Sequence, residues 1–292
     1  MSLVRVGALR VPSLSYCGEL VRVHDRDRFL TCLFAPLDCR EDIYALYALN
    51  HEVAKTREIV SQPIMGQIRL QWWRDAIDAL YENDGSVSSH QELLGALLVA
   101  IGRHGLKQDY FHRLLDARER DLQDDFIETI DDLIDYVDAT SGNLCLLALQ
   151  ILGVQGEEVE NAGRVLGMTW GLMGLLRAVS FHARARRLYL PKEVMVRRGG
   201  DAEDVFAQKF TPALAAVVQE IAEAIRERLS RVDRMQRDLP KTMRPVLLLA
   251  VLIRKYLARL ERCGYNVFDS NFQEPLHLAP WFLLWGGLIK KY

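Results

Sequence analysis

The sequence predicts an all-α protein that folds as a single domain. Apolar residues recur at three- and four-residue steps in one segment after another, and no stretch keeps the strict alternation of a half-buried β-strand. The chain has 292 residues, of which 50% are apolar and 26% charged, so it can bury a sizeable core. No repeat, low-complexity run or linker-like tract divides it, and one domain therefore accounts for its length.

Eight main helices are expected, separated by turns that glycine, proline or threonine begin. Pro63 suits the first turn of the second helix, because the N–H group that proline lacks would be unpaired there in any case. In that helix the apolar residues recur with the period of an amphipathic helix, at Met65, Ile68, Trp72, Ala76 and Ala79. The expected ranges are 40–59, 63–82, 89–103, 107–124, 130–152, 157–181, 210–237 and 242–262.

The charge balance and the cysteines exclude several classes of protein. Lys and Arg number 37 and Asp and Glu 39, so no overall basic field favours a nucleic-acid partner. The five cysteines are widely spread and contain no CxxC pair, which argues against a disulfide framework and a zinc site. The first residues are basic and weakly resemble a transit peptide, without the apolar core of a secretory signal. We expect residues 1–14 to be a flexible N-terminus and residues 15–292 to form the helical domain.

The C-terminal run from Leu276 is mostly apolar but shorter than the roughly 20 residues that cross a bilayer. No transmembrane segment is therefore expected. Trp281, Phe282 and Trp285, followed by Lys290 and Lys291, suit a helix that lies in a membrane interface. The alternative is a terminal helix that packs on the core.

An acidic motif, DDLID, could suggest a metal site. Asp131 and Asp135 have the spacing with which carboxylates on one helix face can share Mg²⁺. The motif also follows Thr129 at an expected helix start, where acids complement the positive end of the helix dipole. An acidic, solvated helix face is the simpler interpretation, and the metal site is kept as an alternative.

Two features mark the helix expected over 157–181 and the segment that follows it. Gly163, Gly167, Gly171 and Gly174 each weaken a helix interior, so either another backbone packs closely on this face or the face lines a cavity. Directly afterwards the chain is rich in basic residues, which could bind a phosphate-bearing group or form a solvated helix end.

Four segments resemble the squalene/phytoene synthases in order and spacing. They are YALYALNHEVAKTREIV from Tyr44, RLQWWRDAIDALY from Arg69, YVDATSGNLCLLALQILG from Tyr136 and GLLRAVSFHARARRLYLP from Gly174. The resemblance runs from about residue 15 to 270. It implies an all-α isoprenoid synthase fold, a single helical domain around a central cavity, with the glycine-bearing helix as a wall of that cavity.

The resemblance also implies where metal ligands would stand. Catalytic members carry two DxxxD motifs, whose positions are Ala54 and Glu58 and then Ala178 and His182 in this chain. Glu58 alone remains a carboxylate, and Lys55 replaces a neighbouring acid. We therefore expect no catalytic residue and no metal at these degenerate positions, and no cofactor.

A narrower likeness, in LLDARERDLQDD from Leu114, in the GLLRAVSFHARARRLYLP segment and in NVFDSNF from Asn266, is to a branch of the family that acts in assembly of mitochondrial respiratory complex I. It implies a non-catalytic protein with complex I subunits or assembly intermediates as partners, at the cytoplasmic or matrix face of a membrane, with a lipid or isoprenoid in the cavity as a further expectation. One alternative is a prenyltransferase that uses Mg²⁺ at Asp131 and Asp135. Another is a metal-free binder of an isoprenoid diphosphate or anionic lipid, for which the candidate residues are Lys55, Arg177, His182, Arg184, Arg187 and Tyr189.

Overall fold

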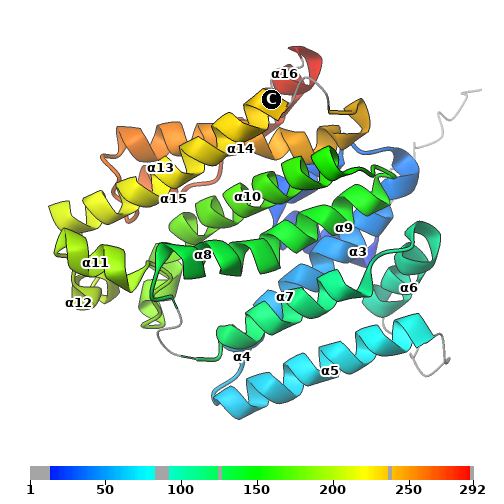
Figure 1. Cartoon of the computed structure of the whole chain (residues 1–292), viewed down its shortest axis with the longest axis horizontal. Coiled ribbons are helices and arrows are strands. Elements are labelled where there is room, and N and C mark those ends of the chain that lie inside the picture. The colour runs from blue at the N-terminus through cyan, green and yellow to red at the C-terminus, as the bar shows by residue number, and fades with distance from the viewer. Residues whose placement is uncertain (1–13, 83–91, 124–126, 236–238, 290–292) are drawn as a thin grey trace, which may run out of the picture.

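The structure, a computed structural model, describes residues 14–82, 92–123, 127–235 and 239–289. Within these ranges every regular element is helical and no strand occurs, which confirms the all-α fold (Figure 1). Ser15 caps the first helix, and residues 1–13 of the expected flexible N-terminus lie outside the described residues.

The helices follow one another with short connections. The first group contains α1 (Tyr16–His24), α2 (Arg26–Cys32), α3 (Leu37–Ala54), α4 (Thr56–Ile59), α5 (Pro63–Glu82), α6 (Glu92–His104) and α7 (Gln108–Arg120). The central group contains α8 (Ile130–Val137), the π-helical turn η1 (Asp138–Gly142), α9 (Asn143–Ile151) and α10 (Glu157–Arg184). The last group contains α11 (Lys192–Arg198), α12 (Ala202–Phe206), α13 (Pro212–Met235), the 3₁₀ turn η3 (Lys241–Met243), α14 (Arg244–Arg262), α15 (Ser270–Gln273) and α16 (Ala279–Ile289).

Three of the expected helices need correction. The helix expected over 40–59 begins at Leu37, directly after Pro36, and divides at Lys55 into α3 and α4. The helix expected over 130–152 contains the π-helical turn between α8 and α9. The helix expected to end at residue 181 continues to Arg184 as α10. Helices α1 and α2, the short α11, α12 and α15, and the 3₁₀ turn η3 were not expected.

Helix α10 is the centre of the bundle. It packs against α13 and α14 on one side and against α8, η1 and α9 on the other, with α7 and then α5 further out (Figure 1). Its interior residues, among them Leu166, Met173 and Leu176, are almost completely buried. A helix that is buried on most sides shows little amphipathic contrast, which explains why its sequence is apolar nearly all round.

Close backbone packing explains three of the four glycines in α10. A Cβ atom on Gly167 would lie 2.5 Å from the carbonyl oxygen of Ser141 and 2.9 Å from the Cα atom of Gly142, in η1. The corresponding atoms on Gly163 and Gly171 would meet the side chains of Leu149 and Val137. These glycines therefore contact η1 and its neighbours instead of lining a cavity. Gly174 differs from them, because nothing lies within 4 Å of the point that a Cβ atom would occupy there.

The apolar residues that identify α5 in the sequence are not its buried face. Gly66, Leu70, Trp73, Ile77 and Leu80 are buried against the bundle. The identifying residues Met65, Ile68 and Trp72 are exposed, and only Ala76 and Ala79 of that set are partly buried. Helix α5 therefore has two apolar faces, one of which the fold leaves in solvent.

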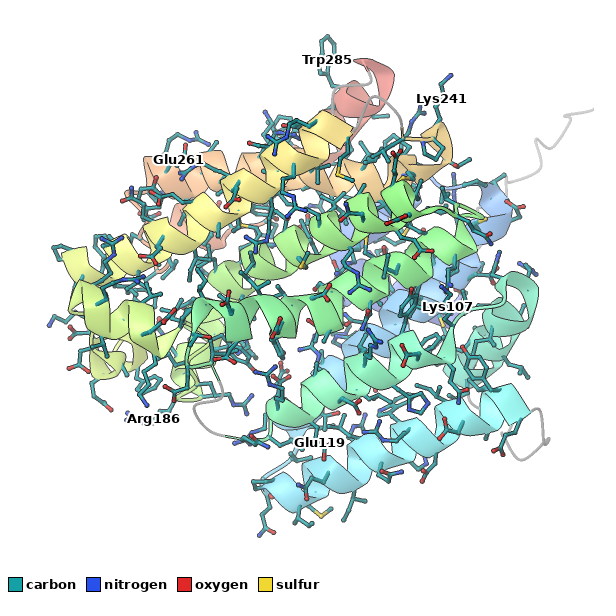
Figure 2. All side chains as sticks on the ribbon, in the orientation of Figure 1. Lys107, Glu119, Arg186, Lys241, Glu261 and Trp285 are labelled. Carbon is teal, nitrogen blue, oxygen red and sulfur yellow. The ribbon has the colours of Figure 1, made fainter. Side chains whose placement is uncertain are left out.

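The terminal helix α16 packs on α14 and α2 through Ala279 and Leu283, which are fully buried. Its other face carries Trp281 and Trp285, which are 69% and 66% exposed. In Figure 2 the Trp285 side chain points away from the body of the protein. None of the helices in the described ranges is long and apolar enough to span a membrane.

We expect Gly167→Ala to lower the free energy of unfolding, by about 1–3 kcal/mol, because the added methyl group would overlap backbone atoms of η1 that cannot move independently. Gly174→Ala is the matched control on the same helix. It should leave stability unchanged or raise it by up to about 1 kcal/mol, since alanine is the better helix former and the space is free. Urea unfolding of both variants measures the difference, and equal stability would contradict the proposed backbone contact.

Candidate functional site

The four degenerate metal-motif positions lie on α3, α4 and α10. Ala54 is the last residue of α3 and Glu58, which is exposed, lies on α4. Ala178 and His182 lie on α10 and are partly buried. The end of α10 is joined to α4, because the Arg187 guanidinium donates a hydrogen bond of 3.0 Å to the carbonyl oxygen of Arg57.

A buried carboxylate, Asp121, organises the end of α10. The Tyr189 hydroxyl donates to its Oδ1 at 2.9 Å and the Tyr136 hydroxyl to its Oδ2 at 3.0 Å. Arg118 forms an ion pair with the same carboxylate at 3.3 Å and donates to the Tyr136 hydroxyl oxygen at 2.7 Å. Burial raises the pKa of both tyrosines, so they stay neutral and serve as donors. One carboxylate thus ties α7, α8 and the segment after α10 together.

His182 completes this cluster. Its ring centroid lies 4.5 Å from that of Tyr189. Burial lowers its pKa to about 4, and the positive charges of Arg187 and Arg118 act in the same direction. His182 is therefore neutral near pH 7 and supplies no cation to an anion site. Its Nδ1 atom and the Nε atoms of Arg118 and Arg187 are buried and have no hydrogen-bond partner among the residues that the structure describes.

The structure brings together three of the six candidate anion-binding residues, His182, Arg187 and Tyr189. Arg177 faces elsewhere, since five residues on an α-helix rotate its direction by about 140° from that of His182. It forms an ion pair of 3.0 Å with Asp27 and stacks over the ring of Tyr256, 3.9 Å from its centroid.

The remaining two candidates are also apart from the cluster. Lys55 forms an ion pair with Glu52 on the same helix end, and Arg69 shares that carboxylate. Arg184 is exposed. The residues that sequence reasoning did not assign to this cluster are Arg118, Asp121 and Tyr136. The hydrogen bond from Tyr189 to Asp121 joins positions 68 apart in the chain, so no local pattern indicates it.

The DDLID motif has the properties of an acidic helix face. Asp131 and Asp135 are exposed. Asp132 forms a capping box with Thr129, whose hydroxyl oxygen accepts a hydrogen bond from the Asp132 N–H at 3.0 Å. Asp138 forms an ion pair with Arg164 at 2.6 Å. In the described ranges no group of three His, Cys, Asp or Glu side chains is arranged to hold a metal ion.

The residues at the degenerate positions do not fit Mg²⁺. Magnesium takes oxygen ligands in near-octahedral geometry, usually from carboxylates that several elements supply. Here two alanines and a neutral histidine occupy three of the four positions, and the one carboxylate, Glu58, is in solvent. The positive charges of Arg118 and Arg187 beside His182 further oppose a cation.

The interior beside α10 contains a buried arginine. The Arg28 guanidinium lies 5.1 Å from the ring centroid of Tyr47 and 5.8 Å from that of Trp170, and it forms an ion pair with Asp25 at 2.8 Å. Trp170 and Met173 are buried here, whereas Phe181 is half exposed and does not point inward. The cation thus lies over two aromatic rings and joins α2, α3 and α10.

The fold is a helical bundle of the isoprenoid synthase type. The chain belongs to the squalene/phytoene synthase family, whose model matches residues 21–281. The resemblance found in the sequence is confirmed.

Relatives of two kinds are similar to the chain. A mouse protein named NADH dehydrogenase (ubiquinone) complex I, assembly factor 6, is 29% identical, over 95% of this chain and 82% of its own length. The human protein of the same name is 27% identical over the same shares. Phytoene synthase 2, chloroplastic, of tomato (Solanum lycopersicum) is 27% identical, over 92% of this chain and 88% of its own length.

Solved structures show the same fold. A dehydrosqualene synthase in complex with ligand superposes with a TM-score of 0.80 at 21% identity, over 95% of this chain and 96% of that chain. The squalene synthase HpnC from Alicyclobacillus acidocaldarius superposes with a TM-score of 0.75 at 20% identity, over 86% of this chain and 93% of that chain. At these identities the likeness establishes the fold alone.

We expect the stability of the protein to fall as the pH is lowered from about 6.5 to about 4. In this window a histidine in the unfolded chain binds a proton that folded His182, with its pKa of about 4, does not bind, so protons favour unfolding. His182→Gln should flatten the pH dependence of the urea midpoint between these values. His277→Gln, at an exposed position, is the control and should leave the pH dependence of the urea midpoint unchanged. Equal slopes for the two variants would contradict the buried, neutral state of His182.

Proposed function

We propose that this chain is a non-catalytic member of the squalene/phytoene synthase family that acts in assembly of the NADH:ubiquinone oxidoreductase, complex I. The observation that carries the proposal is that Ala54, Ala178 and His182 stand at positions where the family resemblance implies metal-binding acids, and that His182 packs on Tyr189, a partner of Asp121. The mouse and human relatives that bear the assembly-factor name support the same role.

Electrostatics argues against a synthase. Departure of a diphosphate requires cations that neutralise the developing charge, and carboxylates must hold those cations in place. Only Glu58 remains of the four acids that the family resemblance implies, and it is exposed on α4. The tomato phytoene synthase is about as similar in sequence as the human assembly factor, so overall identity does not separate the two roles, and the site must.

Deleting the gene in the organism that carries it should lower the amount of assembled complex I several-fold, as native gel electrophoresis and NADH:ubiquinone oxidoreductase activity measure it. The unchanged gene should restore the complex. Glu58→Gln and Asp131→Ala should restore it equally, because neither carboxylate holds a metal in the proposed role. Normal complex I in the deletion strain would refute the assembly role, and failure of both variants would point to carboxylate chemistry.

Incubation of the purified protein with farnesyl diphosphate and Mg²⁺ distinguishes the two alternative functions, a prenyltransferase and a metal-free binder of an isoprenoid diphosphate. Product formation that Asp131→Ala abolishes would establish a prenyltransferase and overturn the proposal. The unpartnered nitrogen atoms of Arg118, Arg187 and His182 instead favour an anion without a metal. In that case farnesyl diphosphate binds in the presence of EDTA, binds less at high salt, and binds less to Arg187→Gln. Binding that EDTA removes would exclude the metal-free alternative.

We also propose that α16 places the protein on a membrane surface, on the matrix or cytoplasmic side. Its exposed face carries Trp281, Leu284 and Trp285, with exposed Leu278 directly before the helix, and Lys255 lies beside it, 4.3 Å from the ring centroid of Phe282. Indole rings favour the headgroup region, and a basic side chain next to them favours anionic lipid. The buried residues of α16 anchor this face to α14, so insertion needs no unfolding.

The full chain should co-sediment with vesicles that contain phosphatidylglycerol. Trp281→Ala together with Trp285→Ala should reduce the bound fraction several-fold, because two interfacial anchors are lost. Trp72→Ala, on α5, is the control for removing an exposed tryptophan elsewhere. Equal binding of the double variant and the unchanged chain would refute this placement.

A further inference from the structure

Helix α5 lies at the edge of the bundle (Figure 1), and one of its faces presents apolar side chains to solvent. We call Ile64, Met65, Ile68 and Trp72 the outer face of α5. They are 54%, 51%, 58% and 43% exposed. With 100° of rotation per residue they lie within an arc of about 100°. Four large apolar side chains along two turns of one helix form a continuous surface, whereas single exposed hydrophobic residues are ordinary.

The fold does not need this surface. The opposite side of α5 already packs on α6 and α7, and its buried residues include Leu70, Trp73 and Ile77. Polar residues on the outer face would leave those contacts unchanged and would hydrate better. The outer face therefore calls for an explanation other than stability of the bundle.

The charges beside the outer face are acidic. Asp75 lies at its C-terminal end and is exposed, with its carboxylate accepting a hydrogen bond from Gln71 at 2.7 Å. Glu92, in the first turn of α6, is exposed and has no ion-pair partner in the described part of the chain. Arg69 is turned toward Glu52 at 3.2 Å. Acidic side chains repel an anionic lipid surface, and amide side chains are not attracted to it. This distinguishes the outer face of α5 from the exposed face of α16.

A pocket opens at the side of the outer face. Trp72 forms part of its wall, and Trp73, Leu93, Tyr16, Arg69, Glu52 and Glu92 form the rest, around a volume of about 430 Å³. The Glu52 carboxylate is already shared by Lys55 and Arg69. Glu92 thus lines the pocket together with Trp72, as an exposed carboxylate with no ion-pair partner among the described residues. A long basic side chain can place its methylene groups on such a wall and its charge on the carboxylate.

We propose that the outer face of α5 docks an amphipathic helix of a partner protein, whose apolar stripe covers Ile64, Ile68 and Trp72 and whose basic side chain enters the pocket beside Glu92. Helices recognise one another in this way when anchors recur at three- and four-residue steps. A second copy of this chain is the poorer occupant. Its own α5 and α6 would bring acidic Asp75 and Glu92 to an acidic face, whereas a helix with a basic side chain would be attracted to it.

This proposal goes beyond the assembly role and does not require it. The test places a photo-reactive benzoylphenylalanine at position 68 of the full chain in its own cells. Irradiation should give one discrete protein adduct, whose cross-linked segment, identified by mass spectrometry, is an amphipathic helix with a basic residue within one turn of the contact. The same group at position 196, on α11, where Val196 is 72% exposed, should not give this adduct.

Charge reversal tests the acidic contribution. Glu92→Lys together with Asp75→Lys should lower the adduct yield from position 68 several-fold, because the basic partner residue is repelled. Asp131→Lys, an exposed acid on α8, is the matched control and should leave the yield unchanged. Both changes are on the surface, and an unaltered urea unfolding curve establishes that the fold is intact.

Four results would overturn the proposal: an adduct with lipid, with a second copy of the chain, or with another part of the same chain, and the lack of any adduct. A yield that charge reversal does not alter would overturn the assignment of a basic partner residue. The gene deletion described above is independent of these outcomes. Normal complex I together with a charge-dependent adduct would refute the assembly role and leave the docking surface standing.

Discussion

The buried carboxylate of Asp121 is the constraint on which this end of the bundle depends. A carboxylate away from water is costly unless donors surround it, and here two tyrosine hydroxyls and one guanidinium do so. Because these donors come from α7, α8 and the segment after α10, satisfying one charge fixes three parts of the chain relative to one another. Removing the carboxylate would leave Arg118 buried beside two hydroxyl groups that lack their acceptor.

This cluster changes what holds the helices together near the degenerate motifs. The family resemblance implies acids on two helices with metal ions between them, which is a connection that forms only when the ions bind. In this chain Arg187 reaches from the end of α10 to the Arg57 carbonyl oxygen, and Tyr189 reaches to Asp121, so protein hydrogen bonds also join these segments.

The sequence predicted the helices well where periodicity was strong, and α5 begins and ends at the expected residues 63 and 82. It did not predict which side of α5 is buried, because both sides are apolar and periodicity alone cannot rank them. Nor did it predict the π-helical turn in the range expected as one helix, where Gly167 packs closely on Ser141 from a distant segment of the chain. Among the site residues, helix geometry alone explains why the side chains of Arg177 and His182 point in different directions. The partners of Asp121 were visible only in three dimensions.

The positions of α16 and α5 set the distance between the two proposed binding surfaces. The two helices lie at opposite edges of the bundle, with the layers of α14, α10 and α7 between them (Figure 1). Gly167 of α10 meets the backbone of η1, and Gly163 and Gly171 meet side chains of α9 and α8, so α10 has little freedom to slide on these neighbours. A helix bound at one edge would therefore be held at a constant height above a surface bound at the other, and the bundle would act as a rigid spacer between them.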